Sequence, residues 1–504
     1  AKLMVPKASV NSYRSAAVWE TFGSITDTDE ENTKTTTIQV IDGLKYIIYT
    51  DQNCATLINN NYTQSEIVIP AEITWEGKTY PVTELGNNCF KDCQSLKSIT
   101  IPSSVTSLGE SCFLNCESLT SITIPSSVTS LGNWCFVNSG LTSITIPSSV
   151  TSLGNWCFEG CWRLTSVTIP SSVTSLGDYC FYGCSGLTSI TIPSSVTSIG
   201  EGCFYGCSGL TSITIPSSVT SIGVGCFWNC TKLTSVTIPS SVTSLGLSCF
   251  QDCRSLTSIT IPSSVTSLGD RCFWNCESLT SITIPSSVTS LGNWCFAGCY
   301  NLYSVTIQSP KIEIGSECFA STTIIDFTIM ATTPPSISEG CFKSCSIDKA
   351  KLMVPKASVN SYRSAAVWET FGTITDTDDK STKTTTVQVI DGLKYIIYTD
   401  QNCATLINNN YTQSEIVIPA EITWEGKKYP VTELGNSCFK DCQSLKSITI
   451  PSSVTRLGSS CFWNCASLTS ITIPSSVTSI GDWCFWGCYN LTSITIPSSV
   501  TSLG

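Results

Sequence analysis

Histidine is absent from the 504 residues of this chain, and charged residues are scarce. Without histidine, the Ser-His-Asp and Cys-His pairs of nucleophilic catalysis and all imidazole metal ligands are excluded. Aspartate, glutamate, lysine and arginine make up 12% of the chain, about half the usual share. Because 37 acidic residues outnumber 26 basic ones, the net charge of −11 argues against nucleic acid as a partner.

Long apolar runs are missing too. No apolar stretch reaches the roughly 18 residues that a membrane-spanning helix needs, so no membrane span is expected in this segment. The chain begins with neither methionine nor a signal-peptide pattern, which predicts a mature chain or a fragment. No Gly-rich phosphate loop, paired-carboxylate cluster or base–nucleophile set stands out. We therefore expect a protein that is not an enzyme and uses no cofactor.

Cysteine is abundant, with 30 residues, and recurs within a short repeat. The consensus is L-T-S-I-T-I-P-S-S-V-T-S-L-G-x-x-C-F-x-x-C-x-x, and the spacing is 23 residues with one step of 22. The leucines that open the repeats are Leu96, Leu119, Leu141, Leu164, Leu187, Leu210, Leu233, Leu256, Leu279 and Leu302. Such a period predicts a repeat array in which neighbouring units bury a shared core.

The 23-residue repeats lie within a second, longer repeat. Ala1–Pro6 returns as Ala350–Pro355, an offset of 349 residues, and the match continues almost unchanged to Gly86 and Gly435. This pattern predicts parts of a tandem array. Its predicted segments are the C-terminal cap of a preceding unit (1–25), a linker (26–37), an N-terminal hairpin cap with the first rung (38–95), 23-residue repeats (96–325), the last rungs and a C-terminal helix cap (326–374), a second linker (375–386), the N-terminal cap of the next unit (387–444) and truncated repeats (445–504).

One repeat, Leu141–Arg163, predicts the local structure of all. Ile144–Ile146 alternates like a strand with one buried face, and Pro147 ends that strand because proline has no amide hydrogen. Cys157–Cys161 has helical spacing and predicts a short helical turn. The predicted core ladder includes Phe113, Phe136, Phe158, Phe181, Cys112, Cys116, Cys157 and Cys161.

Stacked repeats of this kind predict a right-handed solenoid with a parallel β-sheet on one face and short helical turns on the other side. Both ends of such a stack expose strand edges and need caps. Alternation in Tyr46–Leu57 predicts an N-terminal β-hairpin cap, and Ser358–Phe371 predicts an amphipathic C-terminal helix cap.

The paired cysteines leave three states open. Two cysteines at i and i+4 of a helical turn have Cβ atoms ~5–6 Å apart, beyond the ~3.5–4.5 Å of a disulfide. Cysteines on neighbouring rungs are close enough to bond, and an oxidising exterior favours disulfides. Buried free thiols that act as small hydrophobic groups are the preferred interpretation, with disulfides and a metal array as alternatives.

Two surface features are candidates for function. The first is a face of strand hydroxyls, Ser143, Thr145, Ser166, Thr168, Ser189 and Thr191. Cross-strand threonine pairs stabilise sheets, so a purely structural role stands beside a docking surface, an O-glycan carrier and an ice-binding face. The second is an aromatic strip, Trp134, Trp156, Trp162, Tyr179, Tyr182, Tyr205, Trp228, Trp274, Trp294 and Tyr300. It predicts either a stacked structural ladder or a binding strip for glycans, proteins or sister fibres.

The repeat resembles that of the BspA-like leucine-rich repeat proteins of bacterial and protist surfaces. Their I-x-I-P-x-S-V-x-x-I-G-x-x-A-F-x-x-C ring matches Ile144–Cys161, except that Cys157 replaces the usual alanine. Ala331–Pro335 with Val354–Val359 is similar to the family's C-terminal signature, and Gly426–Val431 to its N-terminal hairpin. The resemblance implies a leucine-rich-repeat solenoid, an extracellular or cell-surface location, a role in adhesion, host-protein binding or aggregation, and no shared catalytic site.

These observations favour a non-enzymatic, extracellular tandem-array rod. The first hypothesis is a structural fibre or surface adhesion scaffold that self-associates laterally or end to end, because near-identical units with little charge assemble regularly. The alternative is an adhesin that binds host or neighbour-cell protein or glycan as individual rods, without polymerising.

Overall fold

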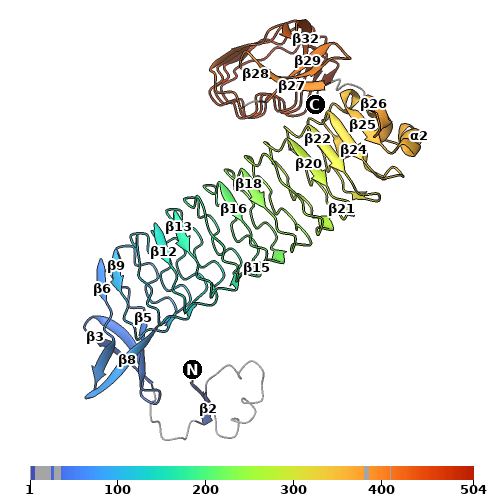
Figure 1. Cartoon of the computed structure of the whole chain (residues 1–504). Coiled ribbons are helices and arrows are strands. Elements are labelled where there is room, and N and C mark those ends of the chain that lie inside the picture. Colours follow the sequence, from blue (N-terminus) through green and yellow to red (C-terminus); the bar gives the residue numbers. More distant parts are fainter. Residues whose placement is uncertain (1, 6–23, 28–35, 380–384, 409, 504) are drawn as a thin grey trace.

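The structure is a computed structural model, and it describes residues 2–5, 24–27, 36–379, 385–408 and 410–503. In the first two ranges it places only backbone strands, β1 (Lys2–Val5) and β2 (Ser24–Asp27), which pair in parallel. The rest of the cap predicted at residues 1–25, and much of both predicted linkers, lie outside the described residues. The other ranges form two solenoids, one long and one short (Figure 1).

Most coils of the long solenoid supply a strand to a first row of parallel strands, because the Ser-Ile-Thr segment alternates exposed and buried side chains. Ser143, Ile144 and Thr145 pair in register with the same positions one coil later. This row contains β6 (Glu66–Val68), β9 (Ser98–Thr100), β12 (Ser143–Thr145), β13 (Ser166–Thr168), β16 (Ser212–Thr214), β18 (Ser235–Thr237), β20 (Ser281–Ile284), β22 (Ser304–Ile307), β24 (Asp326–Ile329), β25 (Lys351–Val354) and β26 (Thr373–Asp376).

A second row of parallel strands, which the sequence pattern did not indicate, runs along the Ser-Leu or Ser-Ile segment of most coils. Its strands are short because proline precedes them and glycine follows them in every repeat. The row contains β10 (Ser107–Leu108), β11 (Ser130–Leu131), β14 (Ser175–Leu176), β15 (Ser198–Ile199), β17 (Ser221–Ile222), β19 (Ser267–Leu268), β21 (Ser290–Leu291) and β23 (Glu313–Ile314).

The third side of each coil, the Cys-Phe-x-x-Cys segment, corrects the predicted helical turn. The amide of Phe113 donates to the carbonyl of Cys135 on the next coil at 2.8 Å, and the amide of Cys116 donates to the carbonyl of Phe113 at 3.3 Å. Because backbone amides are used between coils, the segment is a stacked turn in all coils but the last, where a short 3-10 helix includes Cys341 and Phe342.

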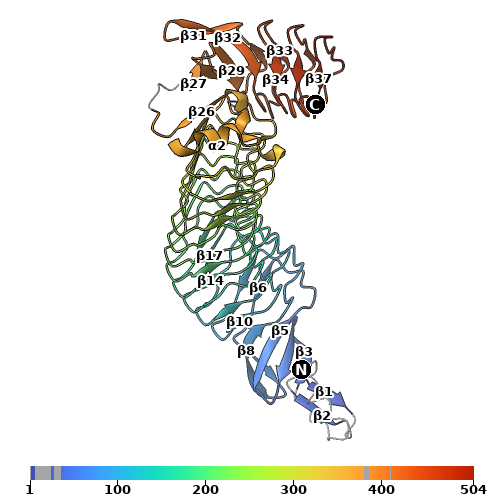
Figure 2. The ribbon, with the colours of Figure 1, turned by 90° about the vertical axis from the view of Figure 1, so that its right-hand side faces the viewer.

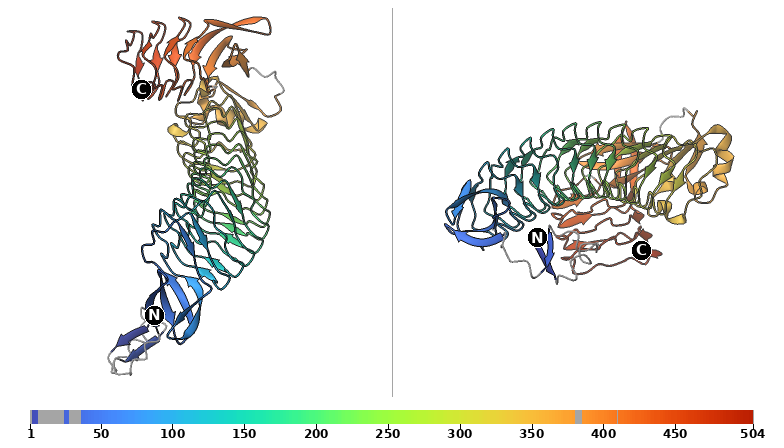
Figure 3. Two further views of the ribbon diagram at one scale, coloured as in Figure 1. Left: turned by 90° about the vertical axis from the view of Figure 1, so that its left-hand side faces the viewer. Right: turned by 90° about the horizontal axis from the view of Figure 1, so that it is seen from below.

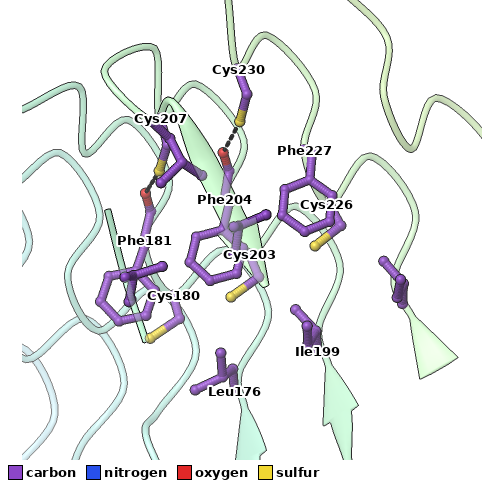
Figure 4. Packing of buried hydrophobic residues seen from close by; sticks show 14 of the residues in the cluster. Leu176, Cys180, Phe181, Ile199, Cys203, Phe204, Cys207, Cys226, Phe227 and Cys230 are labelled. Carbon is purple, nitrogen blue, oxygen red and sulfur yellow. Dashed lines mark hydrogen bonds between the residues drawn. The ribbon is translucent and has the colours of Figure 1, made fainter. Parts of the chain in front are cut away.

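The core is one continuous apolar column along the long solenoid. Its centre is what we call the inner phenylalanine column, in which successive rings stack with centroids 5.3–5.7 Å apart. Figure 4 shows three of these rings between leucine, isoleucine and cysteine side chains. The column consists of Phe90, Phe113, Phe136, Phe158, Phe181, Phe204, Phe227, Phe250, Phe273, Phe296, Phe319 and Phe342.

The N-terminal end is covered by antiparallel strands. Asp42 and Gly43 both have positive φ, 50° and 79°, as a tight two-residue hairpin turn requires. The strands are β3 (Thr36–Ile41), β4 (Leu44–Tyr49), β5 (Cys54–Ile58), β7 (Glu72–Trp75) and β8 (Lys78–Leu85). β8 also pairs in parallel with β10, so the cap continues directly into the second row.

The C-terminal end contains less helix than the predicted 358–371 segment. The α-helix α2 (Val359–Arg363) has five residues, and the chain turns at Val367, whose φ of 69° interrupts helical geometry. Tyr362 and Trp368 are fully buried over the last coils. The remaining helical segments are the 3-10 turns η2 (Glu339–Phe342), η3 (Ile347–Lys349), η4 (Lys356–Ser358) and η5 (Trp368–Thr370).

The second solenoid repeats this architecture with its own core. It crosses the first near the first solenoid's C-terminal end (Figures 2 and 3). Its strands are β27 (Thr385–Ile390), β28 (Leu393–Tyr398), β29 (Cys403–Ile407), β30 (Glu415–Val417), β31 (Glu421–Trp424), β32 (Lys427–Leu434), β33 (Ser447–Thr449), β34 (Arg456–Leu457), β35 (Ser470–Ile471), β36 (Ser479–Ile480) and β37 (Ser502–Leu503).

Candidate binding surface

Six residues of the predicted aromatic strip form a continuous series of ring contacts, which we call the outer aromatic row. It consists of Trp134, Trp156, Tyr179, Tyr182, Tyr205 and Trp228, all of them half-buried. Successive centroids are 5.3, 5.3, 6.1, 4.9 and 4.7 Å apart. The row therefore presents a ribbon of ring edges and faces across five consecutive coils.

Backbone strain accompanies the first half of this row. Trp134, Trp156 and Tyr179 have φ values of 54°, 53° and 52°, in the left-handed region that bulky residues rarely adopt. Two other coils place Gly202 and Gly225 at the same position, with φ of 53° and 58°, and further coils place serine, arginine or glutamate there with similar φ. Left-handed geometry costs a residue with a side chain ~1–2 kcal/mol, so the fold alone would favour glycine here.

Two residues of the row, Tyr179 and Trp228, form hydrogen bonds with neighbouring carboxylates. The hydroxyl of Tyr179 donates to Oε1 of Glu201 at 2.6 Å, and this hydrogen bond, with a smaller contribution from burial, raises the pKa of Tyr179 to about 12. The indole Nε1 of Trp228 donates to Oδ2 of Asp252 at 3.1 Å. These two residues therefore direct their polar atoms to their own neighbours and leave ring surface on the row.

The other four residues of the predicted strip lie outside this row. Trp162 is 56% exposed, and the Arg163 guanidinium lies 4.4 Å from its ring centroid. Trp274 and Trp294 lie on either side of Arg271, 5.6 and 5.1 Å from its guanidinium carbon. Tyr300 contacts the second solenoid, whose Lys440 ammonium lies 4.6 Å from the Tyr300 ring centroid.

A cleft of about 830 Å³ lies where the two solenoids meet. Trp274, Trp294 and Tyr300 line it from the first solenoid, and Trp463 and Trp483 line it from the second. Charged groups share its wall, namely Arg254, Glu317, Lys343, Lys440, Asp441 and Asp482. Sequence reasoning did not place these residues together, because no local pattern tells where a later unit crosses an earlier one.

The hydroxyl face is separate from the aromatic strip. Ser143, Thr145, Ser166, Thr168, Ser189 and Thr191 are all exposed on the first strand row. Their spacing follows the parallel register of that row, with Ser143 opposite Ser166 and Thr145 opposite Thr168. The face is regular, and none of the best-formed clefts of the described residues is lined by these six residues.

The cysteines of the repeats belong to the core. All 30 are free thiols, and the second cysteine of a coil donates its S–H to the carbonyl of the phenylalanine one coil earlier. In Figure 4, Cys207 and Cys230 donate in this way to Phe181 and Phe204, at 3.1 and 3.2 Å. Burial raises the pKa of Cys207 to about 12, so this thiol stays protonated and unreactive at neutral pH.

Ser139 and Thr322 replace the second cysteine on two coils. The Ser139 hydroxyl contacts the Cys161 sulfur at 3.3 Å, and the Thr322 hydroxyl donates to the Phe319 carbonyl at 2.8 Å. Both replacements keep a small hydrogen-bonding group at a buried position. In the described part of the chain, no group of three or more cysteine, aspartate or glutamate residues is arranged to hold a metal ion.

Parallel strands stacked around a continuous apolar column define a leucine-rich-repeat β-solenoid. The family described as BspA type leucine rich repeat region matches residues 83–178, 154–268, 225–348 and 415–504, more than half of the chain. The chain therefore belongs to the BspA-type leucine-rich repeat family. No curated protein sequence matches it significantly. Among the described residues, no helix is long and apolar enough to cross a membrane.

Several solved structures are similar to this chain. A leucine-rich repeat protein from Bacteroides ovatus is 25% identical, with 92% of this chain and 90% of that chain covered and a TM-score of 0.46. A leucine rich cell surface protein from Faecalibacterium prausnitzii is 23% identical, with the same coverage and a TM-score of 0.28. The pneumococcal vaccine antigen PcpA is 17% identical over 69% of this chain and 98% of that chain, with a TM-score of 0.38.

Proposed function

We propose that this chain is part of an extracellular or cell-surface tandem-array rod that serves as a structural fibre or adhesion scaffold and self-associates through repeated surfaces. The observation that carries the proposal is the outer aromatic row, whose first three residues stand at left-handed positions where two neighbouring coils use glycine. The fold imposes left-handed geometry at this position in almost every coil, and a bulky aromatic residue there costs more than glycine or asparagine would, which is typical of positions kept for function.

Repetition makes such a surface effective. Aromatic side chains are enriched in the cores of protein interfaces, and the row places six of them on one rod. Weak contacts gain strength when many engage together. A chain with only 12% charged residues also opposes lateral approach less than an average protein surface does.

The test compares association before and after the row is interrupted. Trp134→Asn and Trp156→Asn are combined, because asparagine tolerates left-handed geometry and already occupies the equivalent position at Asn88. Trp162→Asn is the control, an exposed tryptophan outside the row. Sedimentation velocity over a range of concentrations, with negative-stain imaging, should show assembly for the native chain and the control but not for the double variant. A native chain that stays monomeric at every concentration contradicts the proposal.

The cleft between the solenoids favours a second candidate, an adhesin that binds glycan or protein as individual rods. Five aromatic rings beside carboxylates and ammonium groups offer apolar platforms for sugar faces and partners for sugar hydroxyls. Trp463→Ala should then weaken binding to immobilised glycans while leaving sedimentation unchanged. Glycan binding by a strictly monomeric rod would favour this candidate over the first.

A further inference from the structure

The N-terminal cap occurs twice in this chain, with almost the same sequence and different surroundings. On the first cap, Ile47, Tyr49 and Ile58 of β4 and β5 are half-buried. On the second cap, 349 residues later, Ile396 and Tyr398 of β28 and Ile407 of β29 are 0%, 3% and 3% exposed. The difference arises because the second cap packs on the first solenoid.

An apolar cluster forms the centre of this contact. Tyr303 and Ile325, at the start of β22 and β24, pack with Ile396, Tyr398 and Ile407 in a cluster distinct from both solenoid cores. Lys394 of the second cap lies over the Tyr303 ring, with its ammonium 5.3 Å from the centroid. We call this contact, with the ion pairs around it, the unit joint.

Ion pairs surround the cluster. Glu433 is 3% exposed and accepts from the Lys349 ammonium at 2.5 Å and from the Ser346 hydroxyl at 3.3 Å. The Lys440 ammonium lies 2.7 Å from Oε1 of Glu277. Arg456 of the second solenoid also lies 3.6 Å from Glu433, so Lys349 adds a second cation to this buried carboxylate.

The first cap carries the same groups without these partners. Glu84, the counterpart of Glu433, is only half-buried and accepts from Thr56 of its own cap at 3.3 Å. Lys91, the counterpart of Lys440, is exposed. The first cap is therefore an uncovered copy of a surface that the second cap has covered.

We propose that the unit joint recurs between consecutive 349-residue units, and that Ile47, Tyr49 and Ile58 form the docking surface for the last coils of a preceding unit. This inference rests on the proposed tandem-array rod and specifies its geometry. Residues 1–25 repeat residues 350–374, so the end of a unit stands before the first cap, and both linkers span 12 residues, 26–37 and 375–386. Joints of this kind make the array a rigid stepped rod rather than a flexible string.

Another copy of this chain is a poorer occupant of that surface. Its Tyr303 and Ile325 are already covered by its own second cap. The occupant that fits is the corresponding flank of a preceding unit in the same array, which would bring its own Tyr303, Ile325, Lys349 and Glu277.

Hydroxyl-radical footprinting of the full chain tests the joint. Tyr398 should oxidise several-fold more slowly than Tyr49, and the peptides 36–49 and 385–398 are resolved by mass because Ile38 is replaced by Val387. Ile396→Asp should raise Tyr398 oxidation and lengthen the particle in small-angle X-ray scattering. Ile47→Asp, the same change in the uncovered copy, should leave the particle dimensions unchanged.

A charge swap tests the unit joint independently, should Ile396→Asp fail to fold. Glu277→Lys places a cation opposite Lys440 and should open the joint, and the added Lys440→Glu should close it again. A Tyr398 that oxidises as fast as Tyr49 in the native chain, or a particle whose dimensions do not respond to Glu277→Lys, overturns the joint.

The recurrence of the joint needs one further protein. A copy of residues 38–349, with its own Tyr49 replaced by phenylalanine, is added ahead of Ala1 so that the first cap follows a complete unit. Tyr49 of the original cap should then oxidise as slowly as Tyr398, and an unchanged rate overturns the recurrence. Trp134 and Trp156 line neither the apolar cluster nor the cleft. An open joint with intact self-association therefore overturns this inference alone, and a closed joint without self-association overturns the proposed function alone.

Discussion

The inner phenylalanine column and the outer aromatic row are both ladders of rings on the same coils, and they differ in what constrains them. Ring centroids are 5.3–5.7 Å apart within the column and 4.7–6.1 Å apart within the row. The spacing of the coils sets both distances. The column is phenylalanine in every coil and almost fully buried, whereas the row changes between tryptophan and tyrosine and is half-buried. Burial rather than stacking therefore fixes residue identity, and the row is free to serve a surface.

The largest difference in stability between the two ladders is expected at two residues adjacent in sequence. Phe204 belongs to the inner phenylalanine column and Tyr205 to the outer aromatic row. Phe204→Ala should lower the free energy of unfolding by about 3–5 kcal/mol, because it leaves a cavity in a column with no exposed surface. Tyr205→Ala should cost only about 1 kcal/mol, the size of the stacking it loses. Urea denaturation followed by far-UV circular dichroism measures both, and equal losses would show that the row is also core.

The inner column could be predicted from the sequence because a 23-residue period leaves its phenylalanines only one place, between neighbouring coils. The stacked turn could not, because Cys157–Cys161 has helical spacing whether its amides bond within the coil or to the next one. The Ser-Leu strand row was missed since two-residue strands leave no alternation to detect.

The candidate site could be predicted only in part. All ten residues of the predicted strip lie on the surface or in the cleft, but their division into the outer aromatic row and the cleft depends on φ values and on the unit joint. Trp463, Trp483 and Arg254 join the cleft from positions that only the crossing of the solenoids brings together. Local periodicity encodes the stacking of coils, and it carries no information on where one stack meets another.

A smaller effect should sharpen the comparison at two glycines of the left-handed position. A Cβ at Gly202 would lie 2.3 Å from the Tyr179 ring, whereas a Cβ at Gly225 would meet its nearest atom, on Trp228, at 3.7 Å. Both alanine variants lose stability because alanine is strained in the left-handed region. Gly202→Ala should lower the free energy of unfolding by about 1 kcal/mol more, because it displaces Tyr179 from its stack on Trp156. Thermal unfolding compares the pair, and the emission of Trp156 should change only in Gly202→Ala. A greater loss in Gly225→Ala would mean that the Tyr179 ring does not lie over Gly202.

The smallest effect concerns the proton of Tyr179. Its hydrogen bond to Glu201 favours the neutral phenol, so the pKa of Tyr179 is about 12, above the usual value of 10. The stabilisation from this bond is complete below pH 10 and is lost as the pH rises through about 12, because the folded state holds the proton more tightly than the unfolded state does. Difference absorbance of the native chain against Tyr179→Phe isolates this titration. Glu201→Gln should lower the pKa of Tyr179 toward 10, whereas Glu110→Gln, the same change at the same position of a distant coil, should leave it in place. A Tyr179 that titrates near 10 in the native chain would show that its hydroxyl points to solvent. The outer aromatic row would then expose this hydroxyl instead of holding it in a hydrogen bond to Glu201.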